Sequence, residues 1–304
     1  MRRKALAAAF VLTTFAACSG DASDPTTGST ATATSTPGPS VPDISLVPAT
    51  TGPTVPPPSV DLPDELPTEL VVTELEPGCG VKAADGDAVF VNYVGVRSED
   101  GTQFDSNFGD QPFPVQLGAG GVIAGWDQGL VGVSAGERVQ LDIPSELAYG
   151  DAPEGDVIKA GDALTFVIDV VGVVPTTDPA DAPSDVELPT SDEPVSDLVT
   201  DDVREGDCTA IAAGMTGIIH LQAARADTGA VFGSTWDTAQ PETIVLEEAQ
   251  LLPGLVDGIV GMQVGGRRII TIPSDRAFGP EGRPELDVPP DTAVIVIVDL
   301  LAAF

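Results

Sequence analysis

Residues 125–150 read GWDQGLVGVSAGERVQLDIPSELAYG, and residues 254–279 read GLVDGIVGMQVGGRRIITIPSDRAFG. The two stretches align without a gap and share five glycines, an arginine and an Ile-Pro-Ser triplet. A match of this length within one chain indicates an internal repeat. We therefore expect one fold to occur twice, on either side of a stretch at residues 175–194 that is rich in proline and acidic residues.

The residues around these stretches predict mostly β-structure. In the first repeat, residues 88–96, 138–143 and 163–174 are rich in Val, Ile, Leu and Phe, and Gly, Pro, Asn or Asp stands at their ends. Residues 124–130 fit one short helix. The second repeat copies the pattern and ends in a strand at residues 293–300. These elements predict an α+β fold in each repeat, an antiparallel sheet packed on one short helix.

Length and composition predict the organisation of the chain. The 304 residues are enough for two domains, each with its own core. We assign a signal peptide to residues 1–17, a disordered Thr/Ser/Pro-rich tether to residues 18–67 and an interdomain linker to residues 175–194. The two domains are then residues 68–174 and 195–304.

The first residues predict export. Arg2, Arg3 and Lys4 precede an apolar run at residues 5–17, which is too short to span a membrane and is typical of a signal peptide. The small residues before Cys18 resemble a bacterial lipobox, although that pattern prefers Leu at the position of Phe15. We expect Cys18 to become a lipidated N-terminus that anchors the protein to the outer face of the cell membrane. Plain secretion after cleavage at residue 17 is the alternative.

The charge limits the possible partners. Thirteen Lys and Arg against 47 Asp and Glu give a net charge of −34. Nucleic acids and anionic lipid head groups are repelled by such a protein, because both bind through basic patches. We expect no nucleic-acid partner, and contact with the membrane only through the lipid anchor.

The residue types that most enzymes use are scarce. His220 is the only histidine, there are three cysteines, and no glycine-rich phosphate loop follows a strand. Ser-His hydrolysis, zinc sites and nucleotide binding therefore have no support in the sequence. We expect neither a metal nor a cofactor, and His220 to be a packed or surface residue.

Four segments of the first repeat carry a family resemblance. They read VNYVG at residues 91–95, GTQFDS at 101–106, GVIAGW at 121–126 and LAYG at 147–150. In order and spacing they resemble the signature segments of FKBP-type peptidyl-prolyl cis/trans isomerases. The resemblance implies tandem FKBP-like domains, each a twisted antiparallel sheet of five or six strands wrapped on a short helix, with a hydrophobic pocket between sheet and helix.

The resemblance also implies the site residues and the substrate. The pocket would bind proline-containing segments of exported proteins and isomerise their X-Pro bonds. The residues that match the family's catalytic positions are Tyr93, Asp105, Ile123 and Tyr149. Those that match its substrate-binding positions, with Trp126 as the floor, are Phe104, Phe113, Val122, Trp126, Val157, Ile158 and Phe166. The backbone N–H of Ile123 and the hydroxyl of Tyr149 would hold substrate carbonyl groups.

The first repeat departs from the family beside Asp105. Residues 106–112 form a stretch one residue shorter than is common, and it lacks the arginine that often pairs with the pocket carboxylate. We therefore expect Asp105 to lie in a different hydrogen-bond network.

The second repeat keeps the scaffold and loses the pocket residues. Its substitutions for Tyr93, Asp105, Phe113, Trp126 and Tyr149 are, in that order, Leu221, Gly233, Glu242, Leu255 and Phe278. We expect the first repeat to be catalytic and the second to be a binding or structural domain. The alternative is a lipoprotein that uses both domains to bind peptides or a partner without catalysis.

Cys79 and Cys208 occupy nearly equivalent places, just before the first long strand of each repeat. In an oxidising compartment they could form one bridge between the domains, but equivalent positions in tandem domains need not be close. A disulfide and two free or buried thiols both remain open.

Overall fold

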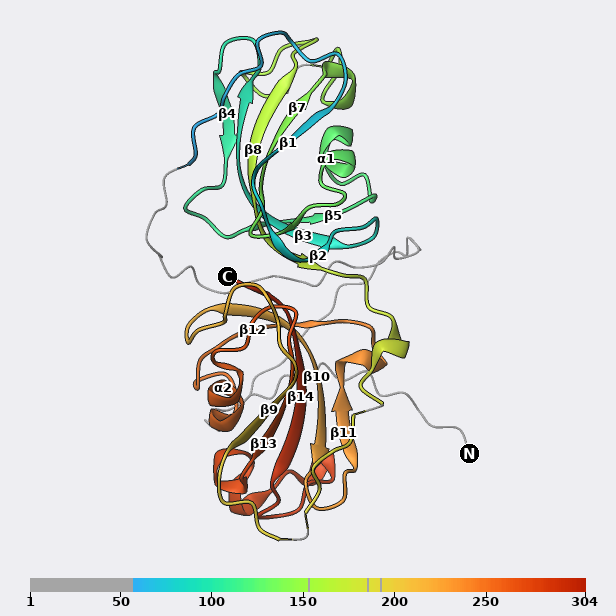
Figure 1. Ribbon diagram of the computed structural model, residues 1–304, viewed down its shortest axis with the longest axis vertical. Helices are drawn as coiled ribbons and strands as arrows, with labels where there is room; N and C mark the ends of the chain where they lie inside the picture. The colour runs from blue at the N-terminus through green and yellow to red at the C-terminus, as the bar shows by residue number, and fades with distance from the viewer. Residues whose placement is uncertain (1–56, 153, 185, 192) are drawn as a thin grey trace, which may run out of the picture.

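The computed structural model describes residues 57–152, 154–184, 186–191 and 193–304. It consists of two β-rich domains stacked end to end (Figure 1). The predicted signal peptide, Cys18 and most of the predicted tether lie outside the described residues. No helix of the described residues is long and apolar enough to cross a membrane.

The first domain is a six-stranded antiparallel sheet packed on one short helix, with a small two-stranded ladder beside it. The main sheet has the order β1-β7-β8-β3-β4, and β5 also pairs with β3, while β2 pairs with β6. The elements are β1 (Val71–Glu76), β2 (Cys79–Lys82), β3 (Ala88–Arg97), β4 (Gln103–Ser106), β5 (Phe113–Gln116), α1 (Ala124–Gly129), β6 (Ser134–Ala135), β7 (Arg138–Ile143), the 3-10 turn η1 (Ser145–Leu147) and β8 (Leu164–Val174).

The second domain repeats this architecture. Its sheet has the order β9-β13-β14-β10-β11, and β12 also pairs with β10. Its strands are β9 (Val199–Arg204), β10 (Thr216–Arg225), β11 (Val231–Ser234), β12 (Glu242–Val245), β13 (Arg267–Ile272) and β14 (Val294–Ala303). Its helix is α2 (Pro253–Ile259), and the 3-10 turns are η2 (Pro179–Asp181), before the sheet, then η3 (Thr235–Asp237), η4 (Ser274–Arg276), η5 (Gly279–Glu281) and η6 (Pro284–Leu286). The predicted α+β class is confirmed in both domains, and the ends of the predicted elements agree with the structure or differ from it by at most three residues.

The glycines that recur in both repeats allow helix and strand to approach closely. A Cβ placed on Gly125 would collide with Ile143 of β7, and one placed on Gly129 would collide with Leu141. A Cβ placed on Gly254 of α2 would likewise collide with Ile272 of β13, and one placed on Gly258 would collide with Ile270. Because real side chains cannot share this space, each helix packs directly on the sheet only if these positions stay glycine.

Two segments predicted to be unstructured pack on the outer faces of the sheets. Val60 lies against Val94, Val96 and Val167, and Gln140 donates its side-chain amide to the carbonyl of Asp61 at 2.9 Å. The prediction of a disordered tether up to residue 67 is therefore wrong for residues 57–67. Because only a few apolar side chains anchor residues 57–67 on the sheet, the composition of this segment resembles that of a disordered segment.

The linker makes the equivalent contact in the second domain. Val186 and Leu188 pack against Ile269, Ile295 and Ile297. We call residues 57–66 the first strap, and residues 183, 184 and 186–191 the second strap. The linker is therefore not a free spacer, because its second half covers a sheet.

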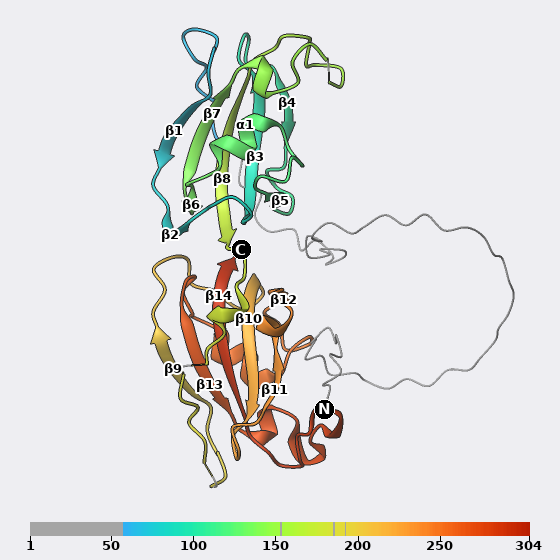
Figure 2. The same cartoon turned by 90° about the vertical axis from the view of Figure 1, so that its right-hand side faces the viewer.

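The two domains meet at the C-terminal ends of β8 and β14 (Figure 2). Cys79 and Cys208 form a disulfide across this interface, with Cα atoms 5.5 Å apart. Of the two alternatives, a disulfide and two free or buried thiols, the structure has the disulfide. Phe90 stacks on Phe304 at 5.6 Å between ring centroids. The apolar residues buried at the interface are Phe90, Val174, Ile218 and Ala302.

The interface is nearly two-fold symmetric. Cys79 and Cys208 are equivalent positions of the two repeats, and so are Phe90 and Ile218. A contact between equivalent positions is what a two-fold axis produces, as in a symmetric dimer. The two domains therefore pack like the subunits of a dimer joined into one chain, and their helices lie on opposite sides of the molecule (Figure 1).

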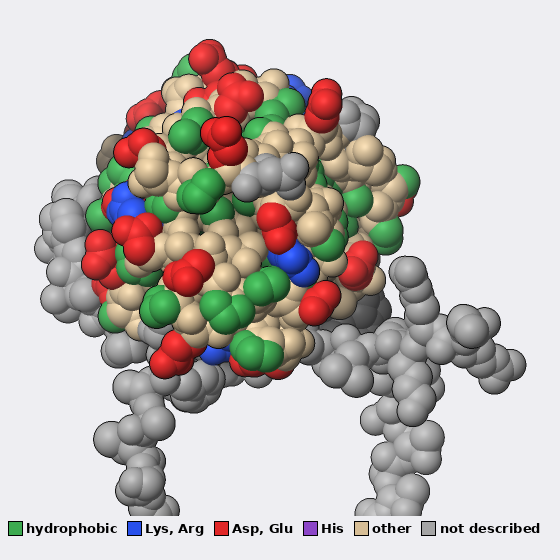
Figure 3. Space-filling view, turned by 90° about the horizontal axis from the view of Figure 1, so that it is seen from below, with side chains coloured by type: hydrophobic (Ala, Val, Ile, Leu, Met, Phe, Trp, Pro, Cys, Tyr) green, Lys and Arg blue, Asp and Glu red, His purple; other side chains and the backbone are tan. Residues whose placement is uncertain are grey.

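Acidic side chains are spread over the end of the second domain, with few basic ones among them (Figure 3). This surface agrees with the net charge of the chain. It offers no broad basic patch to a polyanion.

Candidate active site

An aromatic cluster lies between the sheet and α1 in the first domain. Trp126 of α1 is at its centre, with the ring of Tyr93 at 5.0 Å, that of Phe166 at 5.2 Å and that of Phe113 at 6.4 Å, all in edge-to-face geometry. Phe104 continues the cluster through Phe166 at 5.5 Å. The structure thus brings together five of the aromatic residues singled out from the sequence.

Exposure rises from the centre of this cluster to its edge. Trp126 is 4% exposed and Phe166 is equally buried, whereas Phe113 is 41% and Tyr149 37% exposed. Tyr93 and Phe104 lie half-buried between these extremes. Large rings seldom stay this exposed in a packed core, so the cluster presents apolar surface to a ligand.

The two remaining sides of the cluster come from loops. Val122 and Ile123, half-buried before α1, pack against the same core as Ile158, which is buried. Val157 lies half-buried beside Ile158, in the loop that follows Tyr149. The side chains predicted from the sequence for the pocket therefore lie around this cluster, with Asp105, Phe113 and Tyr149 at its exposed edge.

Three polar hydrogens of the cluster have no acceptor among the residues that the structure describes. They are the indole N–H of Trp126, the backbone N–H of Ile123 and the hydroxyl of Tyr149. Burial and the carboxylates of Glu154 and Asp105 raise the pKa of the Tyr149 hydroxyl, which therefore remains a donor at neutral pH. Apolar rings with free donors beside them suit a ligand that offers carbonyl groups and an apolar ring.

Asp105 is held by Tyr93. The Tyr93 hydroxyl donates to Asp105 Oδ2 at 2.6 Å, and the backbone N–H of Ser106 donates to Oδ1 at 2.8 Å. Burial and this hydrogen bond raise the pKa of Tyr93 well above its usual range. The hydroxyl of Tyr93 is therefore already committed to Asp105, which leaves the ring of Tyr93, rather than its O–H, to face a ligand.

One residue that the sequence analysis did not single out supports this arrangement. Asn107 accepts from the backbone N–H of Tyr93 at 2.7 Å and donates to the carbonyls of Val91 at 3.1 Å and Gln111 at 3.2 Å. It ties the connection between β4 and β5 to β3. These hydrogen bonds depend on the path of the loop, which the sequence does not show. The only signal in the sequence is that Asn107 directly follows Asp105 and Ser106.

In the second domain, side chains of the domain itself fill the corresponding place. Leu255, at the position of Trp126, is fully buried, and Leu251 and Leu252 are buried where Val122 and Ile123 are half-buried. Phe232 and Phe278 contact each other at 6.2 Å. The guanidinium of Arg283 lies over Phe278 at 6.0 Å.

The single histidine is far from the aromatic cluster and packs in the second domain. His220 stacks on Trp236 at 4.9 Å, and its ring nitrogens pair with the hydroxyls of Thr177 and Thr235 at 2.6 and 2.7 Å. Burial lowers the pKa of His220. Within the part of the chain that the structure describes, no three His, Cys, Asp or Glu residues gather as metal ligands would.

Comparison with known proteins identifies relatives for both domains. A family model described as FKBP-type peptidyl-prolyl cis-trans isomerase matches residues 79–171 and again residues 208–301. A Streptomyces anulatus "FK506-binding protein" is 44% identical over 119 residues, covering 38% of this chain and 96% of that protein. Human "Peptidyl-prolyl cis-trans isomerase FKBP10" is 32% identical over 235 residues, covering 77% of this chain but 37% of that protein.

Solved structures of related proteins also match. AtFKBP13 is 34% identical, with a TM-score of 0.32, over 34% of this chain and 91% of that one. The three FKBP domains of wheat FKBP73 align at 19% identity and a TM-score of 0.34, over 77% of this chain and 94% of that one.

Proposed function

The chain belongs to the FKBP-type peptidyl-prolyl cis-trans isomerase family, and from that membership we propose that its catalytic site is the aromatic cluster of the first domain. The family, the tandem arrangement and the enzyme class expected from the sequence are confirmed. One observation carries the assignment to the first domain. Partly exposed rings surround the buried Trp126 there, beside three donors that have no acceptor among the described residues, whereas leucines fill the same place in the second domain.

The reaction needs a surface rather than a nucleophile. Rotation about an X-Pro bond faces a barrier of about 18 to 20 kcal/mol, because the resonance of the amide must be broken. The twisted amide is less polar than the planar one, so an apolar, aromatic site favours it relative to water. The proline ring would lie over Trp126, between Tyr93 and Phe166.

The donors at the edge of the cluster would hold the peptide. The Ile123 N–H and the Tyr149 hydroxyl donate to substrate carbonyls on either side of the twisting bond, which fixes one part of the chain while the other rotates. Asp105 acts through Tyr93, whose ring it holds in place by the 2.6 Å hydrogen bond.

Isolated domains test this assignment. Residues 57–174 and residues 183–304 each include their strap and a complete sheet, and both should be assayed on an Ala-Pro-Phe type peptide in a protease-coupled assay. We expect activity from the first and none from the second. Equal activity in both would refute the assignment, and binding without catalysis by the first would favour a peptide-binding lipoprotein.

We also propose that the protein works outside the cytoplasmic membrane on exported, proline-containing polypeptides. The apolar run at residues 5–17 and the bridge between Cys79 and Cys208 support this location, because disulfides persist in oxidising compartments. The intact mass of the native protein tests the anchor at Cys18. A mature form that begins at Cys18 without lipid, or that begins elsewhere, would refute lipidation.

A further inference from the structure

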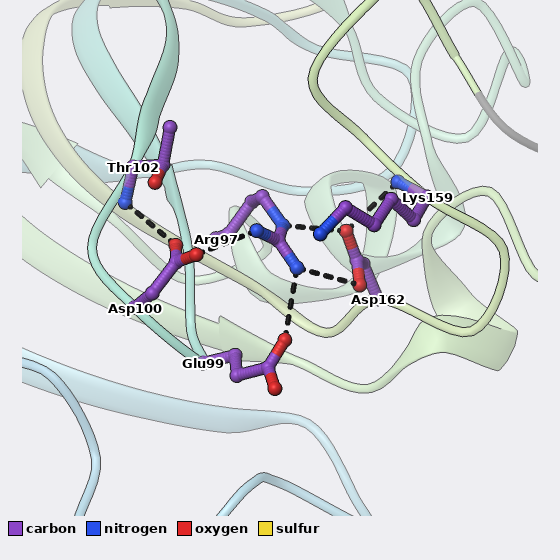
Figure 4. A network of polar contacts seen from close by, with 6 residues as sticks. All are labelled: Arg97, Glu99, Asp100, Thr102, Lys159 and Asp162. Atoms are coloured by element: carbon purple, nitrogen blue, oxygen red, sulfur yellow. Dashed lines mark hydrogen bonds and ion pairs between the residues drawn. The ribbon is translucent and has the colours of Figure 1, made fainter.

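A buried arginine lies at the end of β3, where the first domain's sheet meets the loop that follows Tyr149 (Figure 4). Arg97 is 4% exposed. Its Nε donates to Asp162 Oδ2 at 2.6 Å, and its Nη2 donates to Asp162 Oδ1 at 3.2 Å. Nη1 donates to Asp100 at 2.6 Å and Nη2 to Glu99 at 2.9 Å. One guanidinium therefore joins the β3–β4 connection to the start of β8.

Asp162 is the end of the loop that forms one side of the aromatic cluster. This loop, described at residues 149–152 and 154–162, begins with Tyr149 and contains Ile158. Its two ends are joined by a hydrogen bond from the Gly161 N–H to the Gly150 carbonyl at 2.8 Å. Asp162 Oδ2 also accepts from the backbone N–H of Lys159 at 2.8 Å. Arg97 therefore anchors the loop to the sheet through the carboxylate of Asp162, which also accepts a hydrogen bond from the backbone of the loop itself.

The pairing between Arg97 and Asp162 is strong because both side chains are shielded from water. The hydrogen bond to Arg97 lowers the pKa of Asp162, and the same bond raises that of Arg97. A bidentate guanidinium–carboxylate contact fixes direction as well as distance. Removing Asp162 leaves Arg97 paired with Asp100 and Glu99 but no longer joined to the loop, and removing Arg97 leaves Asp162 only the backbone N–H of Lys159.

The second domain has no carboxylate at the position of Asp162. Arg225 is the equivalent of Arg97, but it pairs with Asp227, two residues away, and contacts Asp287 through the carbonyl at 3.2 Å and through the exposed carboxylate at 3.9 Å. In the register of the sheets, Arg97 faces Leu164 and Arg225 faces Val294, so Thr292 stands where the first domain has Asp162. Arg225 therefore touches the equivalent loop only at the exposed Asp287, whereas a shielded carboxylate in bidentate contact at the end of the loop is found in the first domain.

We propose that Arg97 is a positioning residue for isomerisation: through Asp162 it holds the loop at residues 149–162 so that Tyr149 and Ile158 stay beside Trp126. The described partners of the Arg97 guanidinium are the carboxylates of Glu99, Asp100 and Asp162 and include no ring of the cluster, so Arg97 acts only through the loop. The inference rests on the proposed site in the first domain.

Variants of the full chain test this role. Arg97→Met removes the guanidinium and keeps the aliphatic stem. Asp162→Asn removes the negative charge and replaces one of the two acceptor oxygens with an N–H₂ donor, which breaks the bidentate contact. Arg225→Met is the matched control in the second domain. We expect Arg97→Met and Asp162→Asn to lower kcat/KM at least tenfold, mainly by raising KM, at a temperature where all variants are folded. Arg97→Lys should recover part of the loss, because an ammonium group can still pair with Asp162 through one contact. Arg225→Met should stay within twofold of the parent.

Amide hydrogen exchange supplies a second readout. In Arg97→Met and Asp162→Asn, exchange should accelerate at residues 154–162 and stay unchanged in β3 and β8. Should Arg97→Met fail to fold, Asp162→Asn and Arg97→Lys decide the question. A lower melting temperature with unchanged kcat/KM, or unchanged exchange in the loop, would overturn the proposal. An inactive parent would instead refute the proposed function, and the positioning role with it.

Discussion

Replacing Tyr149 by Phe should lower activity without lowering stability. The substitution removes one oxygen atom, and the Tyr149 hydroxyl has no partner among the described residues, so the folded protein loses no hydrogen bond. The ring is 37% exposed and keeps its position, and surface changes of this kind usually alter the free energy of unfolding by less than about 0.5 kcal/mol.

The activity loss follows from the hydrogen bond that the hydroxyl would make to the substrate. A neutral hydrogen bond is worth about 1 kcal/mol, which corresponds to roughly a fivefold fall in kcat/KM. The raised pKa of Tyr149 keeps the donor protonated, so the parent's activity should not vary with ionisation of this group between pH 6 and 9. The matched control is Phe278→Tyr, which adds a hydroxyl at the equivalent position of the second domain and should change nothing.

Protease-coupled kinetics and thermal unfolding of the same samples measure both quantities. An unchanged kcat/KM in Tyr149→Phe would refute the idea that this hydroxyl holds the substrate. A fall in melting temperature that accounts for the activity loss would refute it equally.

Two further predictions concern the second domain and the interface. Changing both Cys79 and Cys208 to Ser removes a cross-link between residues that are 129 positions apart in the sequence. The free energy of unfolding should fall by up to about 5 kcal/mol, which a lower melting temperature would show. Two titratable thiols from these cysteines in the denatured parent would contradict the bridge. Burial lowers the pKa of His220, so below about pH 6.5 the unfolded chain binds a proton that the folded domain does not, and stability falls as the pH falls. His220→Gln should lose less stability than the parent between pH 7 and pH 5 in urea unfolding, and equal losses would contradict the buried, neutral histidine.

The sequence predicted the two sheets well because their strands carry dense apolar patterns. The strand predicted at residues 138–143 is β7, and the helix predicted at residues 124–130 is α1, which ends one residue earlier. These elements bury a continuous core, and burial of apolar side chains is what their residue pattern encodes.

The straps could not be predicted in the same way. A few apolar side chains, such as Val60 and Leu188, hold each strap on a sheet, within sequence that is otherwise polar or rich in proline. Such a segment gains its order from a surface built by residues far away in the chain. Its own composition resembles that of a disordered tether.

The disulfide and the arginine anchor depend on distances that the sequence does not contain. Equivalent cysteines approach each other only because the domains meet about a near two-fold axis, which the repeat pattern does not require. Arg97 and Asp162 are 65 residues apart and meet through the pairing of β3 with β8. The aromatic residues, in contrast, could be identified from the segments around them, although their mutual distances could not.

The central claim is that isomerisation takes place on Trp126 in the first domain, and Trp126→Leu in the full chain tests it most directly. The substitution copies Leu255 of the second domain, which occupies the equivalent place in a folded core. Losing the floor of the site should remove about 3 kcal/mol of transition-state stabilisation, a fall of more than a hundredfold in kcat/KM, while the variant stays folded. A folded Trp126→Leu protein as active as the parent would contradict the account.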